Sequence, residues 1–246
     1  AHWKFDEAGG SVANDAVGEF HGTLSVSGAA FVSGGVTGNA ISLNRASGGF
    51  VNMGDVLPLT SGDFSIVAWV KMNVGDTTPE SVILAKHQSG GVNGYFLGVN
   101  PAGGVGQNNK ALFYAGGLVS DGPVSTSSVN DGNWHQVVGV YRSGMNKVIY
   151  VDGVAESTNT APAVNGTTAA FLIGGINGSG PTALFTGLVD EVQVYNHALN
   201  PGDVAYLFQN PGSVVAGPPP PPVSEAPIAH WKFDEAGGSV ANDAVG

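Results

Sequence analysis

The chain has 246 residues, with 8 Lys or Arg against 19 Asp or Glu and a formal net charge of -11. Eight cations over this length exclude the clustered basic surface of a nucleic-acid-binding protein, and no apolar run is long enough for membrane insertion. Hydrophobic residues make up 42% and charged residues 11%, which excludes a disordered main body, and the absence of cysteine excludes disulfides and thiolate metal sites.

Strand patterns dominate the chain from its first third onward. Residues 64–72 alternate so that Phe64, Ile66, Ala68, Val70 and Met72 share one face of a strand. Six further segments have strand composition between turn residues: 95–99, 111–114, 134–141, 147–151, 171–173 and 188–195.

One helical turn is predicted, at residues 200–208. Asn200 is a good N-cap residue, Pro201 suits the first helical position, and apolar residues follow. Many short strands with one short helix predict an all-β, antiparallel two-sheet sandwich.

The chain contains an exact repeat of its first 18 residues. Residues 1–18 and 229–246 both read AHWKFDEAGGSVANDAVG, and residues 213–228 between them include five consecutive prolines at 218–222, which favour an extended spacer. We therefore predict a domain at 1–212, a Pro-rich linker at 213–228, and the first strand of a next unit at 229–246.

The repeat has two interpretations. A covalent array of near-identical domains needs no exchange between molecules and is favoured on that ground. In the alternative, residues 229–246 replace the first strand of a neighbouring copy and give head-to-tail assembly.

Five motifs in this order resemble the laminin-G-like, concanavalin A-like lectin/glucanase jelly-roll family, in its bacterial tandem-repeat type: Trp3–Glu7, Phe64–Val70, Gly132–His135, Tyr150–Gly153 and Phe185–Leu199. The resemblance runs from Ala1 to Phe208. It implies two curved antiparallel sheets, a first strand beside the last, and extracellular recognition modules that often bind carbohydrate.

The acidic residues do not form the pair that glycoside hydrolysis requires. Glucanases with this fold use two carboxylates on one face of a strand, about 5–5.5 Å apart in the retaining case. Asp190 and Glu191 are adjacent in a predicted strand, so they are expected to point to opposite faces, as are Asp6 and Glu7. We therefore expect a domain that is not an enzyme.

The resemblance also implies a structural calcium ion. Asp190 matches the family position that often binds calcium, with Asp6 and Asp15 as less certain partners and loop carbonyls near Gly48 completing the oxygen ligands. The alternative is that Asp190 caps a turn or accepts hydrogen bonds from backbone amides.

Carbohydrate binding would need an exposed aromatic side chain beside polar groups. The candidates are Tyr95, Tyr114, Tyr141 and His135, with packing in the core or at a sheet edge as the alternative. Trp3, Trp69 and Trp134 are expected in the core.

Together these features predict a non-catalytic adhesive or structural repeat domain of an extracellular or cell-surface filament protein. Its expected partners are a glycan or neighbouring copies of the same domain, and calcium is its expected cofactor. The alternative is a carbohydrate-binding module attached to a polysaccharide-degrading enzyme.

Overall fold

The computed structural model describes residues 1–100 and 108–217. Most of the predicted linker and the whole second copy, residues 229–246, lie outside the described residues. Within them the elements are 18 strands, two short 3-10 helices and one α-helix, which confirms the predicted all-β class. No helix in this part of the chain is long and apolar enough to cross a membrane.

The first sheet has eight antiparallel strands. Seven of them follow one another in the order β14 (Val154–Thr160), β13 (Asn146–Val151), β12 (His135–Arg142), β7 (Phe64–Lys71), β18 (Gly187–Tyr195), β5 (Asn39–Leu43) and β4 (Ala29–Ser33). The eighth, β1 (His2–Trp3), pairs with β18.

The second sheet also has eight strands, all antiparallel. Their order is β11 (Val124–Ser128), β10 (Lys110–Ala115), β9 (Tyr95–Val99), β8 (Ser81–Lys86), β15 (Phe171–Ile173), β6 (Val51–Asn52), β3 (Gly22–Leu24) and β2 (Val12–Ala13). The remaining elements are a two-stranded hairpin, two 3-10 helices and the α-helix: β16 (Ile176–Asn177), β17 (Pro181–Thr182), η1 (Arg45–Ser47), η2 (Val119–Asp121) and α1 (Pro201–Gln209).

The first strand lies beside the last, as the resemblance implied. His2 is opposite Gln193 and Trp3 is opposite Val192, while β18 also pairs with β7 and β5. The N-terminal residues and the C-terminal strand therefore belong to one sheet.

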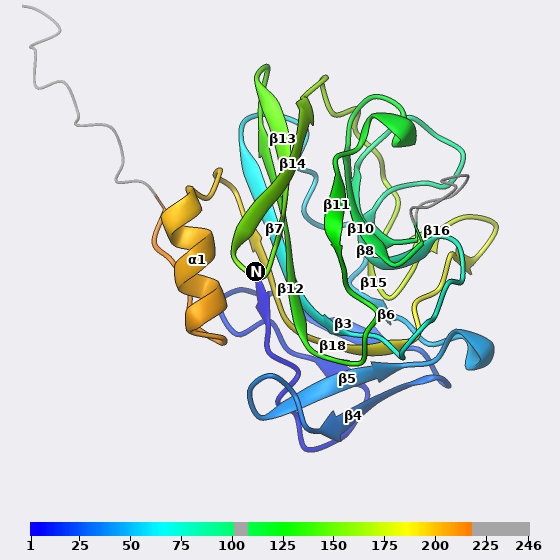
Figure 1. The fold of residues 1–246 in the computed structure, drawn as a ribbon. Helices are drawn as coiled ribbons and strands as arrows, with labels where there is room; N and C mark the ends of the chain where they lie inside the picture. The colour runs from blue at the N-terminus through cyan, green and yellow to red at the C-terminus, as the bar shows by residue number, and fades with distance from the viewer. Residues whose placement is uncertain (101–107, 218–246) are drawn as a thin grey trace, which may run out of the picture.

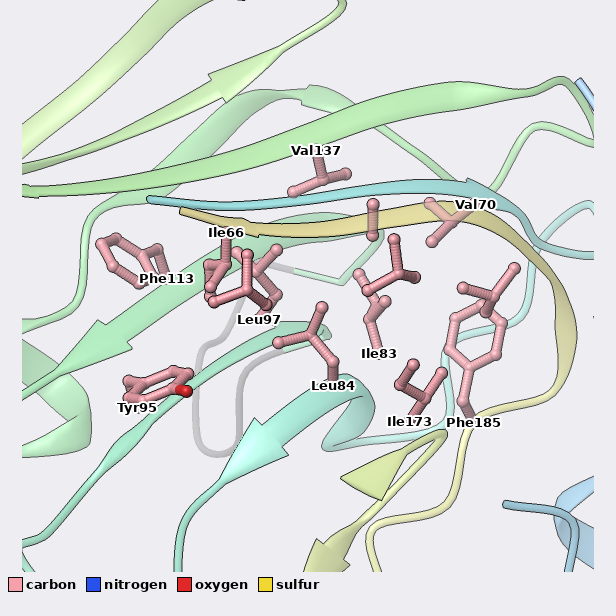
Figure 2. Packing of buried hydrophobic residues seen from close by; sticks show 14 of the residues in the cluster. Ile66, Val70, Ile83, Leu84, Tyr95, Leu97, Phe113, Val137, Ile173 and Phe185 are labelled. Carbon is pink, nitrogen blue, oxygen red and sulfur yellow. The ribbon is translucent and has the colours of Figure 1, made fainter. Parts of the chain in front are cut away.

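Apolar side chains from both sheets fill the space between them. The predicted inner face of residues 64–72 lies wholly in this core, because its alternating residues are all buried there. Figure 2 shows Ile66 and Val70 of β7 lying close to Ile83 and Leu97 of the second sheet.

The outer faces of both sheets are also covered. Helix α1 packs Val204 and Leu207 on the first sheet, and Asn200 caps the helix by accepting a hydrogen bond from the Asp203 N–H (3.0 Å). The β16–β17 hairpin lies against the outer face of the second sheet, where Ile176 joins a separate apolar cluster. In Figure 1 the helix and β16 lie on opposite sides of the two sheets.

Candidate functional site

The predicted calcium ligands Asp190 and Asp6 meet at the turn between β4 and β5, residues 34–38. Asp190 accepts hydrogen bonds from the N–H groups of Val36 (2.8 Å) and Thr37 (3.3 Å). Asp6 accepts one from the N–H of Asn39 (3.0 Å) at the end of the same turn. The alternative predicted for Asp190, binding of backbone amides, is therefore observed, whereas its calcium role stays a prediction.

Glu191 reaches the same turn, which corrects the prediction that it points away from Asp190. The register of β18 shifts after Asp190, and Glu191 has a φ of 47°, so the alternation of side chains breaks at this bulge. Glu191 accepts a hydrogen bond from the Thr37 hydroxyl (2.7 Å) and forms an ion pair with His2. Both carboxylates are buried.

Burial changes the titration of the Asp190 carboxyl group. Removal from water raises the pKa of Asp190 to about 7, and the nearby Glu191 charge adds to the increase. A cation beside Asp190 would reverse this effect, since an opposite charge favours the ionised form. Carboxylate oxygens are ligands that calcium prefers, but this turn faces Asp190 and Asp6 with N–H donors, so calcium at this place stays a prediction.

Asp15 does not join this group. It accepts hydrogen bonds from the backbone of His2 (2.8 Å) and Val17 (3.2 Å), and so ties the N-terminal residues together. In residues 1–100 and 108–217, no three His, Asp or Glu side chains come together in a way that could hold a metal ion.

The three candidate tyrosines are buried, so the structure shows the core packing considered for them and not the exposure that carbohydrate binding would need. Tyr95, Tyr114 and Tyr141 are 1%, 0% and 3% exposed. Each hydroxyl donates to a backbone carbonyl, of Leu57 (2.9 Å), Gly117 (3.0 Å) and Pro162 (2.8 Å), respectively. Burial raises the pKa of each tyrosine. None of them offers a ring to a ligand.

His135 is partly buried and held by carboxylates on both sides. Its Nδ1 lies 2.8 Å from Asp152 and its Nε2 lies 3.0 Å from Asp131. These contacts, the Asp152 hydrogen bond first, raise the pKa of His135 to about 9. Both ring nitrogens are thus engaged within the protein. Trp3 and Trp69 are buried as expected, whereas Trp134 is only partly buried.

A hollow that sequence reasoning missed lies on the outer face of β8, β9 and β10. We call it the outer hollow; it encloses about 340 Å³, a size typical of small-ligand sites. Buried apolar side chains line it, and more exposed polar residues join them: Val82, Phe96, Leu112 and Ile176 among the former, and Glu80, Ser89 and Thr182 among the latter.

The hairpin β16–β17 is fixed over this face by backbone hydrogen bonds. The Val82 N–H donates to Ala183 (2.9 Å), and the Ser89 N–H donates to Asn177 (2.6 Å). Phe96 stacks on Tyr114 with ring centroids 5.0 Å apart, so the aromatic part of the hollow is supported from the sheet.

His87 adds a polar group to the outer hollow. Burial lowers its pKa, so the imidazole is neutral at pH 7. Its Nδ1 bonds to the Asn93 carbonyl oxygen, which can only accept, so the proton resides on Nδ1 and Nε2 is an acceptor. Glu80 is the only charged residue that lines the hollow in the described part of the chain.

Comparisons with known proteins agree with this architecture. The family described as the Concanavalin A-like lectin/glucanases superfamily matches residues 45–205. Among curated proteins, none matches the chain.

Several solved structures share the fold. One of them is domain 4 of AbnA, a GH43 extracellular arabinanase from Geobacillus stearothermophilus, solved in complex with arabinotriose. Its sequence is 24% identical and the TM-score is 0.64, and the match covers 85% of this chain and 97% of that chain. Trypanosoma rangeli sialidase is 22% identical with a TM-score of 0.60, over 84% of this chain and 32% of the sialidase. The binding domain of Paraclostridial Mosquitocidal Protein 1 is 12% identical with a TM-score of 0.57, over 80% and 51% of the two chains.

Proposed function

The chain belongs to the concanavalin A-like lectin/glucanases superfamily, and we propose that it is a non-catalytic carbohydrate-binding domain that holds a neutral glycan in the outer hollow. The observation that carries the proposal is the composition of that hollow, an apolar and aromatic floor with a few polar groups at its edge. The likeness to the arabinanase domain solved with arabinotriose supports a carbohydrate ligand.

Each part of the outer hollow suits one part of a sugar. The C–H face of a sugar ring would lie on Phe96 and Leu112, while its hydroxyls would bond to Ser89, Thr182 and the Nε2 acceptor of His87. The lone charge in the lining is Glu80, and the chain carries a net charge of -11. Both features disfavour anionic sugars and favour neutral ones.

Among the described residues that line the hollow, Glu80 is the only acid, which supports a binding rather than a catalytic role. Hydrolysis of a glycosidic bond ordinarily uses two carboxylates beside the bond. The carboxylates that do meet, Asp190 and Glu191, are buried and hydrogen-bonded to the β4–β5 turn.

We place this domain in an extracellular tandem-repeat protein of adhesive or structural role, because the 18-residue repeat favours an array of such domains. The alternative setting is a module attached to a polysaccharide-degrading enzyme, which the likeness to a domain of an arabinanase favours. Glycan binding through the outer hollow is common to both settings.

A substitution that fills the outer hollow tests the binding proposal. A Cβ at Gly98 would lie in ordinary contact with its neighbours, at 3.4 Å or more, so Gly98→Leu should fold while its side chain occupies the hollow. A glycan array of the wild-type chain first identifies a neutral ligand, and calorimetric titration then measures its affinity for each variant.

We expect Gly98→Leu to weaken binding at least tenfold, whereas Gly166→Val should bind as the wild type does. Gly166 is exposed and does not line the hollow, and a Cβ there also meets only an ordinary contact. Equal affinity in the two variants, or binding confined to anionic glycans, would contradict the proposal.

The calcium ion expected at Asp190 and Asp6 is tested by its removal. A ligand that binds only the native state stabilises it, by about 2.7 kcal/mol at one hundred times Kd, which corresponds to roughly 5–10 °C in Tm for a domain of this size. We expect calcium to raise the Tm and a chelator to reverse the increase, in the wild type and in Asp131→Asn but not in Asp190→Asn. An equal Tm with calcium and with chelator would contradict the proposal that calcium binds at Asp190 and Asp6.

A further inference from the structure

The N-terminal segment, residues 1–18, is bound to the rest of the domain as a separable piece. It contributes one short strand to each sheet, with β1 beside β18 and β2 beside β3. Strands β1 and β2 are each two residues long, so the segment forms only short ladders with the two sheets.

Side chains of this segment bury it in the core and bond it to the rest of the domain. Trp3 is fully buried, stacks on Phe171 at 5.4 Å, and donates its indole N–H to the Phe20 carbonyl (2.8 Å). Phe5 is 1% exposed in the same core, and His2 pairs with buried Glu191.

Residues 229–246 carry every one of these groups at the same spacing. His230, Trp231, Phe233 and Asp243 stand where the first copy has His2, Trp3, Phe5 and Asp15. A site that accepts residues 1–18 is therefore complementary to residues 229–246 in each side chain. The two segments compete for one site per domain.

We propose that residues 229–246 of one copy can bind in the β1 site of a second copy in place of its residues 1–18. The result is an exchanged contact between two copies of this chain, and repetition of that contact is head-to-tail.

Binding to the same chain requires the linker to fold back on itself, whereas binding to a second copy does not. Gly217, the last described residue, lines the same shallow hollow as Ala1, so return to its own site would require residues 218–228 to close on their start. Five prolines favour an extended path of roughly 15 Å, and six remaining residues span at most about 20 Å in reversing it. That closure is within reach but requires the stiff proline run to be reversed, and the single-copy outcome below detects it.

The protein concentration at which exchange is observed depends on the competition between residues 1–18 and residues 229–246 for one site. Residues 1–18 are covalently attached, which gives them an effective concentration in the millimolar range, about a hundredfold above a partner at 10 μM. The wild type should therefore be mostly unexchanged at that concentration. A Trp→Ala change in a core weakens binding by roughly a hundredfold to several thousandfold, which is enough to shift the competition.

The test uses the full chain and light scattering after size exclusion, from 1 to 100 μM. We expect Trp3→Ala to form dimers and larger species that increase with concentration, and Trp3→Ala with Trp231→Ala to remain a single copy at every concentration. A free peptide with the sequence of residues 229–246 should return Trp3→Ala to single-copy size and raise its Tm.

Identical size distributions for the single and double variants, with no Tm response to the peptide, would overturn the proposal. A Trp3→Ala chain that remains a single copy but has a higher Tm than the double variant would also overturn the proposal. This result would mean that residues 229–246 bind in the β1 site of their own chain. If Trp3→Ala does not fold, Trp3→Phe compared with Trp3→Phe/Trp231→Phe asks the same question with a smaller loss of packing.

Discussion

The imidazole of His135 shows how single residues fix the ends of strands in this domain. It bonds to Asp152, in the turn between β13 and β14, and to Asp131, in the loop before β12. Asp152 also accepts a hydrogen bond from the Gln136 N–H (2.9 Å). The charged histidine therefore joins two turns at one end of the first sheet.

This contact makes stability depend on pH in a defined direction. The pKa of His135 is raised from 6.5 to about 9 in the folded chain, so the folded state binds the proton more tightly than the unfolded state. The stabilisation is fully present below about pH 6.5 and is lost as the pH rises through about 9.

We expect Asp152→Asn to lower the His135 titration midpoint, followed by NMR, toward its ordinary value. Asparagine suits this position because residue 152 has a φ of 49°, which Asn tolerates. Asp131→Asn should lower the midpoint less, because the Asp152 bond is the larger cause. An unchanged midpoint in Asp152→Asn would show that this bond does not hold the proton.

Alternation along strands correctly predicted the inner residues of β7, yet it failed at Glu191. A left-handed backbone conformation at Glu191 and a register shift direct its side chain to the β4–β5 turn, as for Asp190. No local sequence pattern predicts this bulge. The sequence left the tyrosines open between core packing and ligand binding, because an aromatic residue in a strand fits a covered face as well as an exposed one.

At the scale of elements, helix α1 is held by its packing on the first sheet. Leu207 is 2% exposed in the cluster between the helix and the sheet, whereas Tyr206 beside it is 47% exposed. The buried face of a short helix contributes most of its stability, since a helix of nine residues is marginal alone.

We therefore expect Leu207→Ala to lower the free energy of unfolding by about 2–4 kcal/mol, because it leaves a cavity at this interface. Tyr206→Ala is the matched change on the exposed face and should cost about 0.5 kcal/mol or less. Urea denaturation measures both. Similar losses in the two variants would mean that the helix is not docked through Leu207.

The seven predicted strands and the helix lie within about one residue of observed elements, including the Asn200 cap, because these signals are local. Other strands, among them β4, β5, β8 and β14, were not predicted. The outer hollow escaped prediction because the hairpin β16–β17 reaches it from a distant part of the chain. A signal was present in residues 95–99, which have no charged side chain on either face and so indicate a strand covered on both sides.

At the scale of the whole molecule, three apolar layers separate the sites from one another. The helix covers one sheet, the main core lies between the sheets, and the β16–β17 hairpin covers the other sheet (Figure 1). The N-terminal segment spans both sheets, whereas the outer hollow lies on the far side of the second sheet. The proposed ligand binding and the proposed exchange between copies would therefore use different surfaces.

The most direct test of the glycan-binding account is to map the bound sugar by amide chemical shifts. During titration with the neutral oligosaccharide found on the array, we expect the largest shifts at Gly90, Gly98, Val99 and Thr182, which line the outer hollow. Residues of α1 should not shift. Shifts concentrated on α1 or on the β4–β5 turn, with none at the outer hollow, would contradict the account.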